Sequence, residues 1–390
     1  MGIRHILTLF VVVAAVMGGI ALLTRWLLSY WLAGAWCRRG QRGLLLIDSV
    51  AILGLLLSRS LLQGFSWAAA ALQFVSIFFM AQLIFSVLML LALVIRFLFR
   101  RMMAVPVDRG RRRLLRHAVL VPTVAGAAGL YGGLYERQQT VENHYVIPVE
   151  KLPHALAGYT IAQLSDIHLG LFFSLEKLEA LLEQAARLGP DVLVITGDLF
   201  DDRELNAAAA GIVDRFCARF PQGIFFCRGN HEHLRGIDEI EALLSKTKIQ
   251  ELVNSSRQLR PGMPLYFAGV DYPMERSAFA ALQAGYTEKA FADVPAEAVK
   301  VLLAHHPDFI TSGRERQAVL TLTGHTHGGQ IGFLGMPLVP PVFSYMRGMY
   351  QQDGCYGYVH SGNGSWFPYR LGCPPEIACF RLQPMEEKTL

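Results

Sequence analysis

The sequence YTIAQLSDIHLG, residues 159–170, decides the fold class of the second part of the chain. Its first six residues form a short, mostly apolar run, and Asp166 and His168 follow directly. A buried strand with metal-binding side chains at its carboxyl end is typical of sites at the edge of an α/β sheet. We therefore expect a layered α/β domain around this strand.

The same pattern continues after Tyr135, where short apolar runs alternate with helical segments. The sequence predicts a helix over 174–188, with Ser174 as its N-cap and Gly189 and Pro190 ending it. We expect strands at 159–164, 191–196, 223–227, 265–270, 300–304, 318–323, 356–360 and 377–382.

Polar motifs also follow four of the later strands. Asp198 lies in GDLFDD, Asn230 and His231 lie in GNHE, a strand ends at His305, and GHTH holds the pair His325 and His327. A lone histidine beside a strand is usually a core or surface residue. Five such motifs in this order, each directly after an apolar strand, indicate one composite site.

The residue types in these motifs suit a metal centre. Imidazole and carboxylate ligands are favoured by zinc, iron and manganese, and the chain has no CxxC motif for a structural zinc site. One carboxylate can bridge two metals, and two metals about 4 Å apart can clamp a phosphoryl group and generate hydroxide near neutral pH. The motifs therefore predict phosphoester hydrolysis with two divalent metals, either Mn, Zn or Fe.

In these five motif blocks the sequence resembles the calcineurin-like metallophosphoesterase family, over about residues 159–382. HHPD at 305–308 and the segment 364–376 resemble the membrane-associated branch related to the YaeI and YkuE phosphodiesterases. The resemblance implies two mixed β-sheets sandwiched between helices.

The resemblance also implies roles for the matching residues. Asp166, His168 and His327 would hold the first metal, Asp198 would bridge, and Asn230, His305 and His325 would hold the second. His231 would protonate the leaving oxygen or stabilise the phosphoryl charge, with Asp201 orienting it. Asn230 and His231 would also bind the substrate.

Some assignments stay open at this point. His306 competes with His305 as the ligand, although the His-x-Pro spacing of the family selects His305. Arg370 could contact a substrate phosphate, and Cys355 could pair with Cys373 in a disulfide. The sequence does not decide between a functional and a structural role for five further residues, Asp202, Glu232, His233, His360 and Asn363.

The first 135 residues differ in composition from the rest. Hydrophobic residues make up 53% of the chain and charged residues only 17%, which is too apolar for an ordinary soluble protein. Residues 1–135 hold fourteen Arg, no Lys and two acids, a net charge of +12, whereas residues 136–390 have a net charge of −7. Because the second part is acidic, the pI of 8.9 does not indicate nucleic-acid binding.

Apolar stretches at 6–32, 44–62, 67–98 and 118–135 predict a bundle of four membrane helices. We expect residues 136–158 to form a tether and residues 159–390 to form the catalytic domain. Asp48 lies near one end of the second stretch, where it could reach the membrane interface.

The placement of arginines predicts the topology. The first loop holds Arg38, Arg39 and Arg42, the third holds seven arginines between 100 and 116, and the second, at about 63–66, is uncharged. Positively charged loops stay in the cytoplasm. We therefore expect a multi-pass protein of the cytoplasmic membrane with its catalytic domain outside.

The leading hypothesis is hydrolysis of a phosphodiester of a lipid or envelope molecule. One alternative is a nucleotide-lipid pyrophosphatase of the UDP-diacylglucosamine type, whose substrate is cytoplasmic. Another is a metal-binding membrane sensor without turnover, which the intact His231 opposes. A transporter is the weakest hypothesis, since the predicted spans hold no acidic residue or lysine deep inside. The sequence leaves the oligomeric state open.

Overall fold

A computed structural model describes residues 3–29, 34–61, 67–102, 110–338, 342–365 and 367–385. The chain forms two compact units, and each has its own core. The first holds residues 1–137 and the short segment 367–369, and the second holds the remaining residues from 138 onward. The predicted second loop at 63–66 and Arg109 of the third loop lie outside the described residues.

The first unit is helical. Its main elements are α1 (Ile3–Ser29), α2 (Gly34–Leu61), α3 (Ala68–Met102) and α4 (Gly110–Leu130), and α4 continues into a π-helical turn (Tyr131–Tyr135) and a 3-10 turn (Glu136–Gln138). Each predicted span falls on one of these helices.

Only one helix in the described part of the chain is long and apolar enough to cross a membrane. It is the segment Ala68–Ile95 of α3, with a mean hydropathy of 2.7, and α1 contributes a shorter apolar segment, Ala14–Ser29. The four-span bundle is therefore not confirmed.

Polar side chains inside the helical unit pair between neighbouring helices. Asp48 of α2 is buried, and its Oδ1 accepts a hydrogen bond from Gln82 Nε2 of α3 at 2.7 Å. Thr24 of α1 and Ser86 of α3 are hydrogen-bonded at 3.0 Å. Asp48 therefore has a hydrogen-bond partner within the unit. Such pairs are typical of contacts between membrane helices.

The second unit contains two six-stranded mixed sheets. The first has the strand order β1-β14-β2-β3-β4-β5. The pair β14–β2 is antiparallel, and the other neighbouring strands of this sheet are parallel. Its strands are β1 (Val141–Val149), β2 (Thr160–Leu164), β3 (Val192–Thr196), β4 (Ile224–Cys227), β5 (Gln250–Glu251) and β14 (Glu376–Pro384).

The second sheet has the order β12-β13-β9-β8-β7-β6, with antiparallel pairs at both edges and parallel strands between them. Its strands are β6 (Ser255–Gln258), β7 (Leu265–Gly269), β8 (Val299–Leu303), β9 (Leu320–Thr323), β12 (Gly348–Gln352) and β13 (Cys355–Val359). A separate two-stranded hairpin joins β10 (Gly332–Phe333) to β11 (Met336–Pro337).

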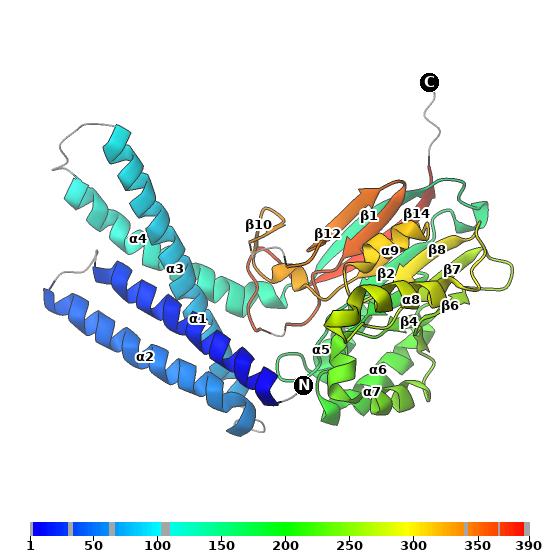
Figure 1. The fold of residues 1–390 in the computed structure, drawn as a ribbon, viewed down its shortest axis with the longest axis horizontal. Helices are drawn as coiled ribbons and strands as arrows, with labels where there is room; N and C mark the ends of the chain where they lie inside the picture. The colour runs from blue at the N-terminus through cyan, green and yellow to red at the C-terminus, as the bar shows by residue number, and fades with distance from the viewer. Residues whose placement is uncertain are drawn as a thin grey trace. The chain divides into compact units, whose positions relative to one another are not determined.

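The two sheets pack face to face between helices (Figure 1). Apolar side chains of both sheets, such as Val194, Phe225, Phe267 and Leu322, form one core between them. A second core lies between the first sheet and α5 (Leu175–Arg187), α6 (Arg203–Phe216) and α7 (Asn230–Leu244). A third joins the second sheet to α8 (Phe279–Phe291) and α9 (Phe309–Glu315). This confirms the predicted α/β domain with mixed sheets.

The eight predicted strands are all present, but the predicted tether is not a free linker. Its central part forms β1, which pairs in parallel with β14 over nine residues, from Val141 opposite Glu376 to Val149 opposite Pro384. The sequence did not predict this strand, because it contains polar residues and Pro148. Its position at the edge of the sheet accommodates the proline. The possible pairing of Cys355 with Cys373 is not present in this structure, where neither residue forms a disulfide.

Candidate metal centre

The predicted ligands meet where parallel strands of the two sheets end. Asp166 and His168 follow β2, Asp198 follows β3, and Asn230 begins α7 after β4. On the second sheet, His305 follows β8, and His325 and His327 follow β9. Parallel strands align their carboxyl ends, so the fold brings residues far apart in the sequence to one edge.

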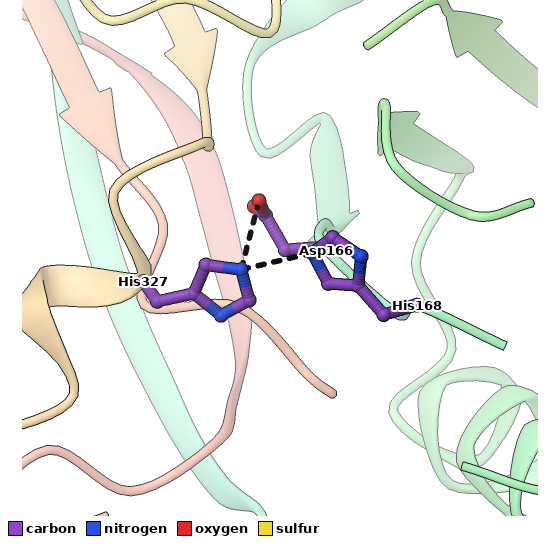
Figure 2. Close-up of side chains that lie close together, drawn as sticks. All are labelled: Asp166, His168 and His327. Carbon is purple, nitrogen blue, oxygen red and sulfur yellow. Dashed lines mark hydrogen bonds and ion pairs between the residues drawn. The ribbon is translucent and has the colours of Figure 1, made fainter. Parts of the chain in front are cut away.

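One group of ligand atoms comes from Asp166, His168 and His327 (Figure 2), all three of them buried. His327 Nε2 lies 2.9 Å from His168 Nε2 and 3.4 Å from Asp166 Oδ1. Two imidazole nitrogens and a carboxylate oxygen that converge this closely match the donor set predicted for the first metal.

A second group contains Asp198, His305 and His325. His305 Nε2 lies 3.1 Å from Asp198 Oδ2 and 3.2 Å from His325 Nδ1. The other ring nitrogen of His305, Nδ1, lies 2.7 Å from the Thr196 carbonyl oxygen. Because a carbonyl can only accept, Nδ1 carries the proton and Nε2 is the atom left to bind a metal.

Asp198, a member of the second group, also faces the first group. Its Oδ2 is 3.1 Å from His305 Nε2, 3.6 Å from His168 Nε2 and 4.0 Å from His231 Nε2. Its Oδ1 accepts a hydrogen bond from the backbone N–H of His231 at 2.9 Å. One carboxylate oxygen thus faces nitrogens from both groups, which is the arrangement that a bridging ligand requires.

The residues present fit two divalent cations. Asn230 Oδ1, the expected ligand atom of that side chain, is buried and has no hydrogen-bond partner in the described part of the chain. Burial acts to lower the pKa of His305, but the carboxylates of Asp198 and Asp166 raise that pKa to about 10. The carboxylates therefore hold a positive charge between them, and a metal cation supplies that charge as a proton does.

The backbone at the candidate ligands is unusual. Asp166, His168, Asp198, His325 and His327 all have φ between 48° and 72°. This left-handed region is uncommon for residues other than glycine, and such strain is found mainly at functional sites. The tight turns aim the side chains back across the ends of the strands.

His231 is held beside the two groups by a carboxylate. Its Nδ1 is hydrogen-bonded to Asp201 Oδ1 at 2.7 Å, and Arg235 Nε donates to the same oxygen at 2.7 Å. Burial acts to lower the pKa of His231, but Asp198 and the hydrogen bond to Asp201 raise it. A protonated His231 with Nε2 directed toward Asp198 is suited to donate a proton.

Comparison with known proteins agrees with this geometry. A family model for calcineurin-like phosphoesterases matches residues 159–329. The chain is 30% identical over 275 residues to an uncharacterized metallophosphoesterase of Aquifex aeolicus (strain VF5), and the match covers 67% of this chain and 98% of that protein. The chain belongs to the calcineurin-like metallophosphoesterases.

Other relatives carry the same domain. The chain is 29% identical over 289 residues to the uncharacterized metallophosphoesterase YkuE of Bacillus subtilis (strain 168), covering 70% of this chain and 97% of that protein. It is 32% identical over 295 residues to the transmembrane protein with metallophosphoesterase domain of Bos taurus, covering 71% of this chain and 64% of the bovine protein. This metallophosphoesterase is therefore a metal-dependent hydrolase of phosphoester bonds, and the family uses two divalent metals.

Glu232 is a site residue of the metallophosphoesterase that the sequence left undecided. Its side chain is fully buried and accepts four backbone N–H groups, from Asp198 at 3.0 Å, Leu199 at 2.9 Å, Phe200 at 3.1 Å and Gly229 at 2.7 Å. The carboxylate therefore fixes the loop that carries Asp198. A solvated role for Glu232 is excluded by this burial.

The structure distinguishes the two neighbouring histidines of the metallophosphoesterase. The His306 ring packs against the rings of Phe279, Phe343 and Tyr272, and its centroid lies 5.4 Å from that of His325. Burial lowers the pKa of His306 to about 4. His305, not His306, is directed at the carboxylates.

Arg370 lies in a different environment from the one expected of a substrate-binding residue. The guanidinium is fully buried and donates to the backbone carbonyls of 361, 362, 364 and 373 and to Ser365 Oγ, while Nη2 lies 3.4 Å from His327 Nδ1. These contacts favour a role in positioning His327 and its neighbouring loop over contact with a substrate phosphate.

The remaining open candidates have structural partners. Asp202 is the N-cap of α6, His233 is hydrogen-bonded to Asp271 at 2.7 Å, and Asn363 Oδ1 accepts from the Ser165 N–H at 2.9 Å. His360 is buried and accepts a hydrogen bond from the Gly362 N–H. These contacts shape the loops around the site.

An aromatic surface beside the second ligand group was missed by the sequence reasoning. The rings of Tyr272 and Phe343 lie 5.4 Å and 5.1 Å from the His325 ring, and Tyr272 Oη is 3.4 Å from His325 Nε2. Both side chains are half-buried. Their sequence neighbourhoods contain no motif, so only the fold reveals them.

Proposed function

We propose that this metallophosphoesterase hydrolyses a phosphodiester of a lipid or envelope molecule at a membrane surface. The observation that carries the proposal is the single oxygen Asp198 Oδ2, which faces His168 from one ligand group and His305 from the other. When bound there, two divalent cations supply Lewis-acid activation of the phosphoryl group and of the attacking water.

The chain's own residues divide into ligands and a proton donor. Asp166, His168 and His327 would hold the first cation, Asp198 would be shared by both, and Asn230, His305 and His325 would hold the second. His231 Nε2 donates a proton to the leaving oxygen, and the contact between Asp201 and its Nδ1 keeps the ring oriented. Asn230 and His231 contact the substrate phosphate.

The diester preference rests on the surface beside His325. Tyr272 and Phe343 offer uncharged, half-buried rings there. The N–H groups of Arg370 donate to backbone carbonyls and to Ser365. Arg370 is therefore not placed to neutralise the second negative charge of a phosphomonoester. An uncharged surface suits the carbon-bearing second substituent of a diester.

The membrane setting is also part of the proposal. We infer four spans in the cytoplasmic membrane and a catalytic domain outside it, supported by the apolar segment Ala68–Ile95 and by the arginines of the first and third loops. A relative described as a transmembrane protein with the same domain is consistent with this arrangement.

The test is an assay of the purified full-length protein with Mn²⁺, Zn²⁺ or Fe²⁺. Bis-p-nitrophenyl phosphate and p-nitrophenyl phosphate serve as diester and monoester, and the Asp198→Ala variant controls for contaminating enzymes. We expect faster turnover of the diester. Faster turnover of the monoester would overturn the diester preference, and no turnover of either with metal bound would favour the sensor hypothesis.

A further inference from the structure

The β10–β11 hairpin, residues 331–338, exposes apolar side chains in an otherwise well-packed domain. Phe333 is 61% exposed, Leu334 82%, Met336 64% and Leu338 63%, and Leu334 is the most exposed of the large apolar side chains in the described residues. The sequence has no charged residue from 328 to 346. A contiguous apolar patch of this kind marks an interaction surface rather than an ordinary water-facing loop.

The tip of this hairpin departs from the residue preferences of its turn. Leu334 and Gly335 have φ of 50° and 81°, so both central residues are in the left-handed region that a type I′ turn requires. Asn, Asp or Gly normally fills the first of these positions. A leucine there has a strained backbone and an exposed side chain, which indicates a function for the side chain outside the folded domain.

The base of the hairpin is fixed close to the metal centre. The Gly332 N–H donates to the Leu371 carbonyl at 2.7 Å, and the Leu371 N–H donates to the Gln330 carbonyl at 3.0 Å. Gln330 follows the 3-10 turn His327–Gly329, which begins with a candidate ligand. A contact made by the hairpin tip would therefore hold the metal centre at a set distance from the contacted surface.

We propose that the hairpin tip inserts into the interfacial region of the lipid bilayer. The same chain contains the membrane-spanning candidate Ala68–Ile95, which would keep the domain near a bilayer. In the described residues the hairpin pairs with neither six-stranded sheet, and its apolar side chains at 333, 334 and 336 are exposed. Uncharged apolar tips of this kind are stabilised in the headgroup and acyl boundary.

The test uses the full-length protein in vesicles of phosphatidylcholine and phosphatidylglycerol and needs no turnover. The substitution Met336→Cys adds one cysteine, which carries an environment-sensitive fluorophore. The control label is at Lys289→Cys, an exposed position on α8. Wild-type protein, labelled in parallel, gives the background from the six native cysteines.

We expect lipids brominated in the upper acyl chain to reduce the emission at the Met336 position by about half, since interfacial insertion reaches about 5–10 Å. Aqueous iodide should quench only the Lys289 label. Adding Leu334→Asn should abolish the quenching by lipid while the hairpin folds, because asparagine suits the turn.

Two results would overturn the proposal. Iodide quenching of the Met336 label equal to that at Lys289 would show that water surrounds the tip. Protection from both quenchers would show that protein covers it, either another part of this chain or a second copy. Either result leaves the proposed hydrolysis untouched, because that activity is assayed separately.

Discussion

The Glu232 carboxylate accepts the backbone N–H of Asp198 at 3.0 Å, and it also accepts three further N–H groups from the two loops around that residue. The position of the proposed bridging ligand thus depends on a side chain that is not itself a candidate ligand. Positioning of this kind determines how well a metal site is formed.

Replacement of Glu232 should therefore damage the site from a distance. In Glu232→Gln the amide NH₂ faces N–H donors, and each buried donor left without an acceptor costs about 1–3 kcal/mol. We expect a lower unfolding temperature and reduced metal content by elemental analysis. The matched control is Glu239→Gln on the same helix, where the side chain is 66% exposed. Metal content and stability equal to those of the control would contradict the positioning role.

Substitutions at Asp198 and His231 should distinguish the loss of metal binding from the loss of proton transfer. We expect Asp198→Ala to lose both metals and all activity, because each ligand group loses an oxygen. His231→Ala should keep the metals and lose about 10²–10⁴-fold in rate. Metal content and turnover are measured on the same preparations, with the exposed His144→Ala as control. Equal loss of metal in both variants would make His231 a ligand.

The two adjacent histidines should behave oppositely. His305→Ala removes a nitrogen that lies 3.1 Å from Asp198 and should reduce metal content. His306→Ala should leave metal content unchanged, because that ring packs on Phe279 and Phe343. Metal titration of both variants checks the assignment, and loss of metal in His306→Ala would refute it.

The pH profile should depend on Asp201. The hydrogen bond to Asp201 and the nearby Asp198 carboxylate raise the pKa of His231, and a proton donor is active below its pKa. Activity should therefore fall as pH rises through that value. Asp201→Asn removes the charge beside Nδ1, so the alkaline limb of kcat/KM should move to lower pH. An unmoved limb in this variant would show that another group is the proton donor.

The orientation of the catalytic domain can be read from C-terminal fusions. We expect active alkaline phosphatase and dark green fluorescent protein, since the arginine-rich loops should stay in the cytoplasm. The opposite result would place the domain inside and revive the nucleotide-lipid pyrophosphatase, whose substrate is cytoplasmic.

The core strands and the clustering of the candidate ligands could be predicted because both depend on local patterns. Runs such as 192–195 are apolar throughout, and the candidate ligands follow shortly after them. The role of Glu232 could not be predicted, since its four donors come from two loops brought together only by the fold. Strand β1 carries polar residues and Pro148, and β10 and β11 have two residues each. Such short or edge strands lack a periodic signal.

The parallel pair β1–β14 affects the order in which the domain can form. The hydrogen bond between Asn143 and Glu376 joins residues 233 positions apart, and β14 also lies between β1 and β2 in the sheet. During synthesis, β1 has no neighbouring strand until β14, the last described strand, has been made. The helical unit can therefore form while the first sheet is still open, and a chain cut before Glu376 leaves the β2 edge of that sheet unpaired.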